Sequence, residues 1–323
     1  MNGALLTVKN LKVVFHTYRG TVHALDHVNF TVLKNERFGI IGETGCGKSV
    51  TSLAIMRLIE QPGEIVEGEI IFDGKDLVKT QENTLNTIRG REISMIFQEP
   101  LSSLNPVMKV GFQIGESIAR IKNTSIKACK NDIAEVLRAV DLDPDRVANL
   151  YPHELSGGMA QRIMIAMALS SKPKLLIADE PTSALDVTIQ AQIMNLLDDL
   201  VSKMNNTVIL ITHDLGVAAQ FCDKIMIMYA GTAVEQAKTE ELFANPLHPY
   251  TKGLLKAIPR VGNRDRLTGI PGSVPDLVNP PSGCRFHPRC PNAMKICSSQ
   301  KPALMEINPG HLVACHLYGD ENG

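Results

Sequence analysis

The chain has 323 residues, is 44% hydrophobic and carries a formal net charge of −1. This length and composition allow a sizeable buried core, which argues against global disorder, and the near-neutral charge argues against a general nucleic-acid binder. Because no run approaches the ~18 apolar residues of a membrane span, and the N-terminus lacks a signal-peptide pattern, we expect a cytosolic chain or one held to a membrane by protein partners.

Residues 1–98 are typical of strands joined by turns, with one helix. An amphipathic helix is expected from about residue 48 to 59, after a glycine-rich turn. Hydrophobic alternation and short apolar runs predict strands over residues 5–15, 22–32, 38–41, 69–72 and 93–97.

Helical periodicity replaces the strand signals over residues 99–171, for example at Ile133, Leu137 and Val140. The strand and helix alternation then returns, with a strand over 175–178, a helix over 187–203 and a strand over 208–212. The simplest interpretation is an α/β fold with a mostly parallel core sheet and an inserted helical subdomain.

Composition changes near Asn245, because eleven of the 18 prolines follow it. Proline removes amide donors and breaks regular elements, so this tail needs something other than a helix bundle to order it. We therefore expect a first domain over 1–245, with its helical subdomain at about 99–171, and a proline- and cysteine-rich extension over 246–323.

A phosphate-binding loop is the first motif that carries chemistry. The G-x-x-x-x-G-K-[ST] pattern lies between a strand and a helix, as this motif requires, which makes a chance glycine-rich turn the lesser alternative. The glycines allow backbone amides to cradle phosphate oxygens, the lysine reaches the β- and γ-phosphates, and the serine ligates Mg²⁺. The residues are Gly42, Glu43, Thr44, Gly45, Cys46, Gly47, Lys48 and Ser49, and Val50 follows them.

Two adjacent carboxylates, Asp179 and Glu180, end the apolar strand over 175–178. A strand tip is where ligands bind in α/β sheets. Asp179 is expected to hold the Mg²⁺ shell, and Glu180 to orient or deprotonate the attacking water. A solvated turn is the alternative, which the nearby phosphate-binding loop disfavours.

A serine and two glycines at a helix start identify the class. The run over 155–162 reads Leu-Ser-Gly-Gly-Met-Ala-Gln-Arg and begins 20 residues before the strand that ends in the two acids. It resembles the signature of ABC ATPases. The resemblance implies ATP held between two such subunits, with the γ-phosphate bound in trans by Ser156, Gly157, Gly158 and Met159. A simple helix cap by Ser156 is the alternative, and it leaves the second glycine unexplained.

The resemblance assigns further residues in chain order. Gln98 is similar to the glutamine that touches Mg²⁺ and water and faces the transporter, and His213 to the switch histidine that contacts the γ-phosphate and Glu180. Residues 183–186 are similar to the D-loop. Phe15 is the candidate for stacking on adenine, with Tyr18 as the alternative.

Two positions depart from the family pattern. Met159 replaces glutamine in the signature, and Val50 replaces the frequent threonine after the P-loop serine. We expect hydrolysis to survive both changes. Cys46 at a helix N-terminus is either a thiol of lowered pKa or, as we favour, a tolerated small residue.

Four cysteines crowd the last forty residues, at Cys284, Cys290, Cys297 and Cys315. Four soft sulfur ligands suit an iron–sulfur cluster or zinc. The spacing lacks the closely paired cysteines common in zinc sites, but three histidines keep a mixed zinc site open: His287, His311 and His316.

With the segment 245–251, this tail resembles the C-terminal extension of dipeptide and oligopeptide ABC importer ATPases, some of which carry a 4Fe–4S cluster. The resemblance implies an ATPase at the cytoplasmic face of the cell membrane. Its implied partners are two membrane-spanning permease subunits, a second, identical or related ATPase subunit and, indirectly, an extracytoplasmic solute-binding protein, with no nucleic acid. Nickel or another small solute is the alternative cargo. A soluble ABC ATPase acting on ribosomes or DNA is a more distant alternative.

Overall fold

A computed structural model of the protein describes residues 3–183, 185–257 and 269–319. The chain forms two compact units. The first unit contains residues 1–79 and 211–323, and the second contains residues 80–210. The C-terminal residues therefore group with the first part of the chain, and the expected boundary near residue 245 stays a prediction.

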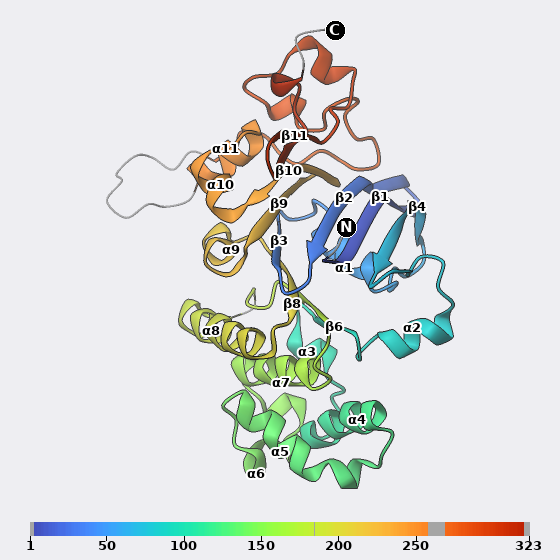
Figure 1. The fold of residues 1–323 in the computed structure, drawn as a ribbon, viewed down its shortest axis with the longest axis vertical. Helices are drawn as coiled ribbons and strands as arrows, with labels where there is room; N and C mark the ends of the chain where they lie inside the picture. Colours follow the sequence, from blue (N-terminus) through green and yellow to red (C-terminus); the bar gives the residue numbers. More distant parts are fainter. Residues whose placement is uncertain (1–2, 184, 258–268, 320–323) are drawn as a thin grey trace. The chain divides into compact units, whose positions relative to one another are not determined.

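The N-terminal part of the first unit is an antiparallel sheet in the order β2-β1-β4-β5 (Figure 1). The two long strands predicted at the N-terminus are both present, and they form a hairpin. The strand predicted over 69–72 is longer than expected, because it pairs with β1 as far back as Gly63. The strands are β1 (Ala4–Thr17), β2 (Gly20–Leu33), β4 (Gly63–Phe72) and β5 (Lys75–Asp76).

A second sheet in the first unit has the neighbouring strands β11-β12-β10-β9-β3. Strand β3 pairs with β9 in parallel, whereas β9, β10, β12 and β11 pair successively antiparallel. The C-terminal strands thus extend the sheet that carries the predicted phosphate-binding loop. These strands are β3 (Arg37–Ile41), β9 (Lys224–Tyr229), β10 (Thr232–Lys238), β11 (Met305–Asn308) and β12 (His311–Val313).

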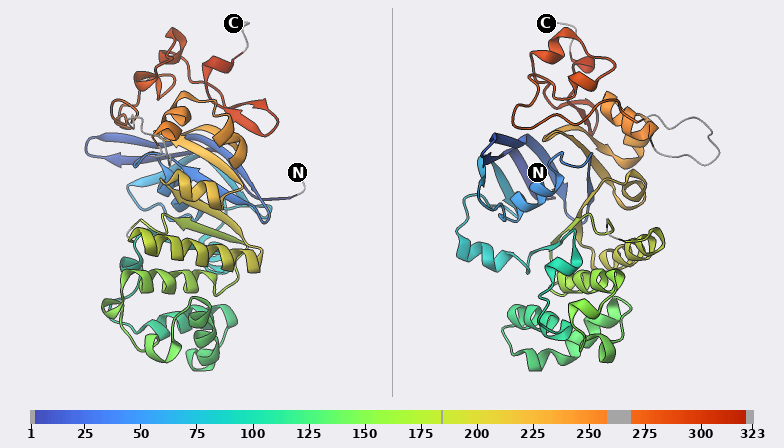
Figure 2. Two further views of the ribbon diagram at one scale, coloured as in Figure 1. Left: turned by 90° about the vertical axis from the view of Figure 1, so that its left-hand side faces the viewer. Right: turned by 180° about the vertical axis from the view of Figure 1, so that it is seen from behind.

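Short helices complete the first unit (Figures 1 and 2). Helix α1 packs against β2, α9 against β3, and α10 against β9 and β10. The C-terminal tail is ordered by 3₁₀ turns and the β11–β12 pair, in keeping with its proline content. The helices are α1 (Lys48–Ile55), α9 (Leu215–Phe221), α10 (Thr239–Ala244) and α11 (Pro249–Lys256), and the 3₁₀ turns are η3 (His287–Arg289), η4 (Lys295–Ser298) and η5 (His316–Tyr318).

Helix α1 is shorter than the sequence predicts. It ends at Ile55 because Arg57 adopts a left-handed conformation with φ of 54°. The Leu58 amide donates back to the Leu53 carbonyl, a pattern that closes a helix end. The hydrophobic periodicity of the sequence does not predict this helix end, because apolar residues continue beyond it to Ile59.

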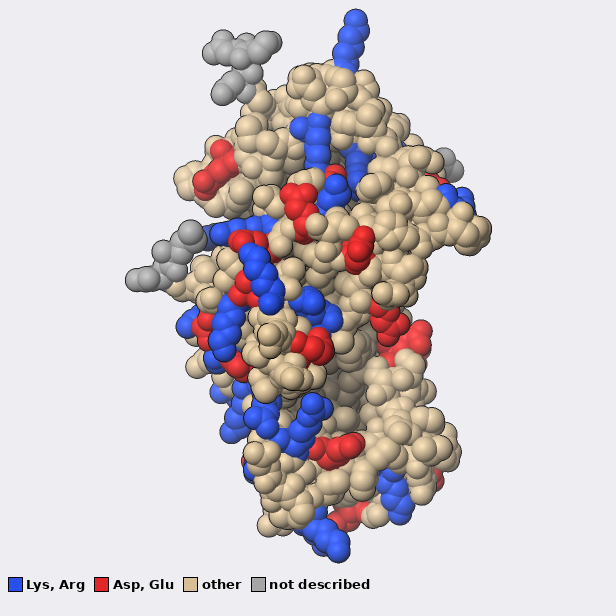
Figure 3. Space-filling model, turned by 90° about the vertical axis from the view of Figure 1, so that its right-hand side faces the viewer, with Lys and Arg blue, Asp and Glu red and all other residues tan. Residues whose placement is uncertain are grey.

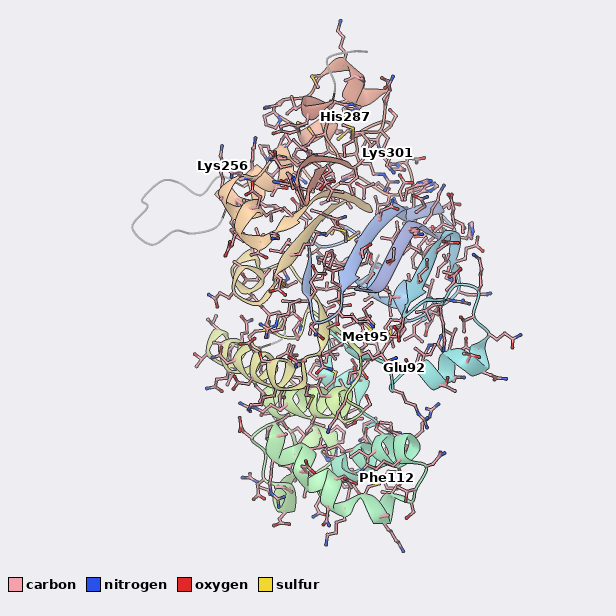
Figure 4. The ribbon with its side chains drawn as sticks, in the orientation of Figure 1. Glu92, Met95, Phe112, Lys256, His287 and Lys301 are labelled. Carbon is pink, nitrogen blue, oxygen red and sulfur yellow. The ribbon has the colours of Figure 1, made fainter. Side chains whose placement is uncertain are left out.

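The second unit combines helices with the parallel strand pair β6 and β7. Both strands are fully buried, as their apolar sequences predict. Figure 4 marks Met95 on β6 and Glu92 just before it; Glu92 pairs with Lys174 at 2.8 Å, next to the start of β7. The strands are β6 (Ile93–Ile96), β7 (Leu175–Asp179) and β8 (Thr207–Thr212), and the last crosses the division between the units.

Within the second unit, α7 contacts the helices α3, α4, α5 and α8 (Figure 1). Buried aliphatic side chains such as Ile114, Leu137 and Ile163 form their common core. The helices are α2 (Glu82–Ile88), α3 (Pro100–Ser103), α4 (Val110–Lys122), α5 (Lys130–Ala139), α6 (Pro144–Val147), α7 (Gly157–Leu169) and α8 (Val187–Met204), and the 3₁₀ turns are η1 (Ile126–Cys129) and η2 (Pro152–Glu154).

The surface drawn in Figure 3 carries Lys, Arg, Asp and Glu side chains interspersed. Among the described residues, no helix is long and apolar enough to cross a membrane.

Candidate ATP site and C-terminal cysteine segment

The phosphate-binding loop connects β3 to α1 in the first unit. Gly47 caps the helix with φ of 102°, a conformation that other residues rarely adopt. Gly42 is required by space, because a β-carbon there would lie 2.2 Å from the Met228 carbonyl oxygen. The Lys48 ammonium donates to the carbonyls of Gly42 and Glu43 at 2.9 and 3.3 Å. The loop is therefore already closed around its lysine.

The other residues of the phosphate-binding loop differ in how exposed they are to solvent. Thr44 and Gly45 are exposed at its tip, whereas Ser49 and Val50 are half-buried in the first turn of α1. Cys46 is buried, with 1% of its surface exposed. Burial raises the pKa of its thiol to about 11 despite the nearby Lys48 charge. The structure thus contradicts the lowered thiol pKa and agrees with a small buried residue at this position.

Gln98 and Glu180, one of the two predicted acids, are in contact within the second unit. Asp179 is buried at the end of β7, and Glu180 follows it in a left-handed conformation with φ of 45°. The Gln98 amide donates to Glu180 Oε2 at 3.2 Å, although the two residues are 82 positions apart. The backbone of Glu180 is held as well, because its carbonyl accepts from the Ser183 amide and hydroxyl, each at 3.2 Å.

The signature residues begin helix α7. Ser156 is the N-cap, and its hydroxyl accepts from the Met159 amide at 3.3 Å. Ser156 and Gly157 are exposed, and Gly158 is half-buried. Met159 packs against the buried core of the helical region, which gives this departure from the family pattern an apolar role. The cap alternative therefore holds as local structure, and it leaves the exposed glycine step available to an anion.

The remaining predicted residues lie at ends of strands and helices. His213 is exposed directly after β8, before Asp214 caps α9 through bonds to the Gly216 and Val217 amides. Asp186 is the N-cap residue of α8. Of the expected D-loop, Ala184 lies outside the described residues.

The aromatic candidates for adenine differ in their surroundings. Phe15 is half-buried on β1 and lies against Gly63, where an added β-carbon would be 2.5 Å from its ring. Tyr18, at the tip of the β1–β2 hairpin, is 99% exposed. Neither arrangement tests adenine stacking, so both assignments stay predictions.

The four C-terminal cysteines have free thiols. The pKa of the Cys284 thiol is raised to about 11, mainly by burial and further by the three neighbouring cysteines. The Met294 amide donates to Cys297 Sγ at 3.5 Å, and the backbone amides of Phe286, Asn292 and Leu317 partly offset the rise in pKa that burial causes at Cys284, Cys290 and Cys315.

These sulfurs are the donor type that an iron–sulfur cluster uses, and amide bonds to sulfur are typical of cluster sites. However, no group of three or more His, Cys, Asp or Glu side chains in the described ranges is arranged to hold a metal ion. The structure therefore does not support the expected cluster as a preformed site. The three histidines do not complete a zinc site either: His311 bonds to buried Glu235 at 2.8 Å, His316 to the Gln300 carbonyl, and His287 to the Cys284 carbonyl.

Two contacts to the phosphate-binding loop were not predicted. The Glu43 amide donates to the Tyr250 hydroxyl at 3.1 Å, and Arg289 contacts the Glu43 carboxylate at 3.0 Å. Both partners come from the C-terminal part of the chain. The sequence shows an arginine beside a cysteine and a tyrosine after His-Pro, but nothing in it joins them to residue 43.

Comparisons with known proteins agree with this geometry. Residues 25–183 match the family described as ABC transporter, and residues 234–297 match the oligopeptide/dipeptide transporter C-terminal region. The oligopeptide transport ATP-binding protein AppD of Bacillus subtilis is 49% identical over 98% of this chain and 98% of its own length. The chain belongs to the oligopeptide/dipeptide family of ABC transporter ATP-binding proteins.

Other members of this ABC family and solved structures extend the match. The oligopeptide transport ATP-binding protein OppD of Escherichia coli is 49% identical over 97% of this chain and 93% of its own length. The dimeric, post-hydrolysis structure of the ATP-binding cassette MJ0796 with ADP and phosphate has a TM-score of 0.65 at 29% identity. It covers 72% of this chain and 98% of its own. The ABC-type α/β fold is thus shown for most of the chain.

Proposed function

We propose that the chain is the ATP-hydrolysing subunit of an ABC importer and that it energises the uptake of oligopeptides or dipeptides across the cytoplasmic membrane. Relatives named as oligopeptide transport ATP-binding proteins support this cargo, because they match over nearly the full length of both chains. The match to the oligopeptide/dipeptide C-terminal region supports it independently of the ATPase part. Nickel or another small solute is the alternative cargo.

The observation that carries hydrolysis is the bond between Gln98 and Glu180. A carboxylate that follows a buried strand and is held by a side-chain amide can accept a proton from water in a fixed position. We assign Glu180 as the general base, Gln98 as the residue that orients it and contacts Mg²⁺ and water, and His213 as the contact to the γ-phosphate.

The phosphates are bound by the loop from Gly42 to Val50. Lys48 would exchange its two carbonyl partners for the β- and γ-phosphates, whose charge makes them stronger acceptors. Ser49, Asp179 and Gln98 offer the hard oxygen ligands that Mg²⁺ prefers, and the ion would neutralise charge on the phosphates. Phe15 remains the proposed adenine contact.

The exposed signature supports a nucleotide shared between two subunits. Helix α7 begins at the signature residues Ser156, Gly157, Gly158 and Met159. The first two of these are exposed, and such helix starts attract phosphate. We propose that they contact the γ-phosphate bound by a second ATPase subunit, identical or related. The pair would act at the cytoplasmic face of the membrane on two permease subunits, with cargo delivered by a solute-binding protein.

Substitution of Glu180, the proposed general base, tests the catalytic assignment. Glu180→Gln is expected to bind Mg-ATP but to hydrolyse it at least 100-fold more slowly, because the amide cannot take a proton. It should therefore accumulate an ATP-bound dimer, measured by size-exclusion chromatography with light scattering. Asp199→Asn, at an exposed acid on α8, is the matched control and should behave as wild type. Wild-type turnover by Glu180→Gln would refute the assignment.

Reconstitution tests the cargo. The purified ATPase, its partner ATPase and the permeases would be placed in liposomes with the solute-binding protein. We expect ATP-dependent uptake of labelled di- or oligopeptides, which should stop when Glu180→Gln is present. Uptake of nickel but not of peptides would select the alternative.

We also propose that Cys284, Cys290, Cys297 and Cys315 bind a 4Fe–4S cluster, with zinc as the alternative. The support is the set of four cysteine sulfurs, one of which, Cys297 Sγ, accepts from the Met294 amide, in a segment of the chain that has little regular structure. A bound cluster would cross-link this segment covalently through its irons. Anaerobically purified protein should absorb near ~400 nm and contain iron and sulfide. A colourless, zinc-loaded protein would contradict the cluster.

A further inference from the structure

Arg289 is a buried cation that reaches the phosphate-binding loop. Its side chain is 7% exposed, and its Nη1 atom donates to Glu43 Oε2 at 3.0 Å and to the Tyr229 hydroxyl at 3.4 Å. The remaining donors bind the carbonyls of Pro271 at 2.9 Å and Ile270 at 3.1 Å. The guanidinium is thus held on several sides, so its position is set before any nucleotide arrives.

Glu43 is bound through each of its polar groups. Its amide donates to the Tyr250 hydroxyl, and its carbonyl accepts from Lys48 Nζ and from the Cys46 amide. Its carboxylate, 27% exposed, pairs with Arg289. A shift of Glu43 would therefore move the same loop that presents Lys48.

Arg285 makes a second connection to this loop. Its guanidinium donates to the carbonyls of Ala230 and His23, and it lies 3.4 Å from Asp26. The next residue after Ala230, Gly231, donates its amide to the Cys46 carbonyl at 2.9 Å. We call Arg285 and Arg289 the arginine clamp, since they support the phosphate-binding loop near Cys46 and at Glu43.

An aromatic cluster joins the two arginines. Phe286 lies 5.1 Å from Tyr229 and 5.3 Å from Tyr250, measured between ring centroids, and all three rings are buried. The segment 284–290 is consequently fixed against β9 and α11 by packing as well as by charge. Figure 4 labels His287, which lies within this segment.

The electrostatic role follows from the charge of the substrate. A carboxylate in a loop that binds a polyphosphate repels the polyphosphate. Because the Glu43 carboxylate is only 27% exposed, water screens this repulsion only partly. Arg289 neutralises that carboxylate without itself belonging to the loop. We propose that Arg289 is a positioning and charge-compensating residue for nucleotide binding, through which the C-terminal cysteine segment sets the affinity for Mg-ATP.

This inference rests on the proposed ATPase function, and it adds a consequence. Arg289 immediately precedes Cys290 in the chain, and Arg285 immediately follows Cys284. A change in the backbone of the cysteine segment would therefore be transmitted to Glu43 and to the Ala230–Gly231 turn.

The proposal is tested by removing the Arg289 charge alone and then the Arg289 and Glu43 charges together. Arg289→Gln is expected to weaken Mg-ATP binding about tenfold, equivalent to about 1.4 kcal/mol, with kcat changed less than about twofold. Glu43→Gln added to Arg289→Gln should recover most of the affinity, because no uncompensated carboxylate then remains. The loss in the single variant should shrink as salt rises. Lys295→Gln is the matched control, because Lys295 is an exposed cation on η4 in the same C-terminal segment.

A nucleotide-free readout separates this proposal from the ATPase assignment. Peptide-resolved hydrogen–deuterium exchange over residues 38–50 should be faster in Arg289→Gln than in wild type or Lys295→Gln. The proposal is overturned if either the exchange rate or the Mg-ATP affinity is unchanged in Arg289→Gln, or if Glu43→Gln gives no recovery in the double variant. By contrast, wild-type protein that does not bind Mg-ATP would overturn the proposed function, and unchanged exchange in Arg289→Gln would still decide against the clamp.

Discussion

His248 makes the stability of the C-terminal region depend on pH. The residue is 1% exposed, and its Nδ1 atom accepts from the Tyr250 amide at 3.0 Å at the start of α11. Burial, followed by the charge of Lys252, lowers the pKa of His248 to about 3. The folded protein therefore keeps this imidazole neutral where an unfolded chain would protonate it.

The size of the effect follows from proton linkage. Because the folded pKa is depressed, the stabilisation is complete above the unfolded pKa of about 6.5 and is lost as the pH falls from there toward about 3. Each pH unit in this window costs about 1.4 kcal/mol, so the free energy of unfolding should fall by about 2 kcal/mol between pH 6.5 and pH 5.

The comparison with His248→Asn isolates this contribution. Asparagine can still accept a bond at the start of a helix but does not titrate. Urea unfolding of nucleotide-free protein, followed by far-UV circular dichroism, would be measured for both proteins at pH 7 and pH 5. The difference in unfolding free energy between wild type and variant should change by about 2 kcal/mol between the two pH values. A change below about 0.5 kcal/mol would refute the buried neutral histidine.

Three further predictions concern buried groups. Cys46, with its thiol pKa raised to about 11 by burial, should be alkylated at pH 7.5 much more slowly than a free thiol, and rapid labelling in peptide-resolved mass spectrometry would contradict this. Glu235→Ala should lower the free energy of unfolding by about 3 kcal/mol, measured by urea unfolding. The reason is that the Leu247 and His248 amides and the His311 ring lose their buried acceptor. A loss below about 1 kcal/mol would contradict that hydrogen-bond network. Ile163→Ala should cost about 2–4 kcal/mol and Ile163→Val about 1 kcal/mol, and equal losses would show that the helical core does not enclose this side chain.

Local sequence determined the parts of the molecule that depend on neighbours in the chain. The glycines and lysine between 42 and 48 specify a strand, a turn and a helix within a dozen residues, and the structure forms that sequence of elements. Apolar runs such as 175–178 likewise predicted buried strands, since a strand buried on both faces leaves no polar alternation. The end of α1 at Ile55 is not predicted by the sequence, because the left-handed residue that follows it, Arg57, is not a glycine and so carries no compositional mark.

Only the tertiary structure decided which distant residues meet. Arg289 and Glu43 are 246 positions apart, and their pairing follows from β12 joining β10 and from Phe286 packing on Tyr229 and Tyr250. The direction of the Cys46 pKa was also decided there: the position at a helix N-terminus left a lowered thiol pKa open as the less favoured alternative, whereas burial raises the pKa. Hydrophobic pattern and turn chemistry act over a few residues and can be read in order, but the surroundings of a charge depend on every segment that folds around it.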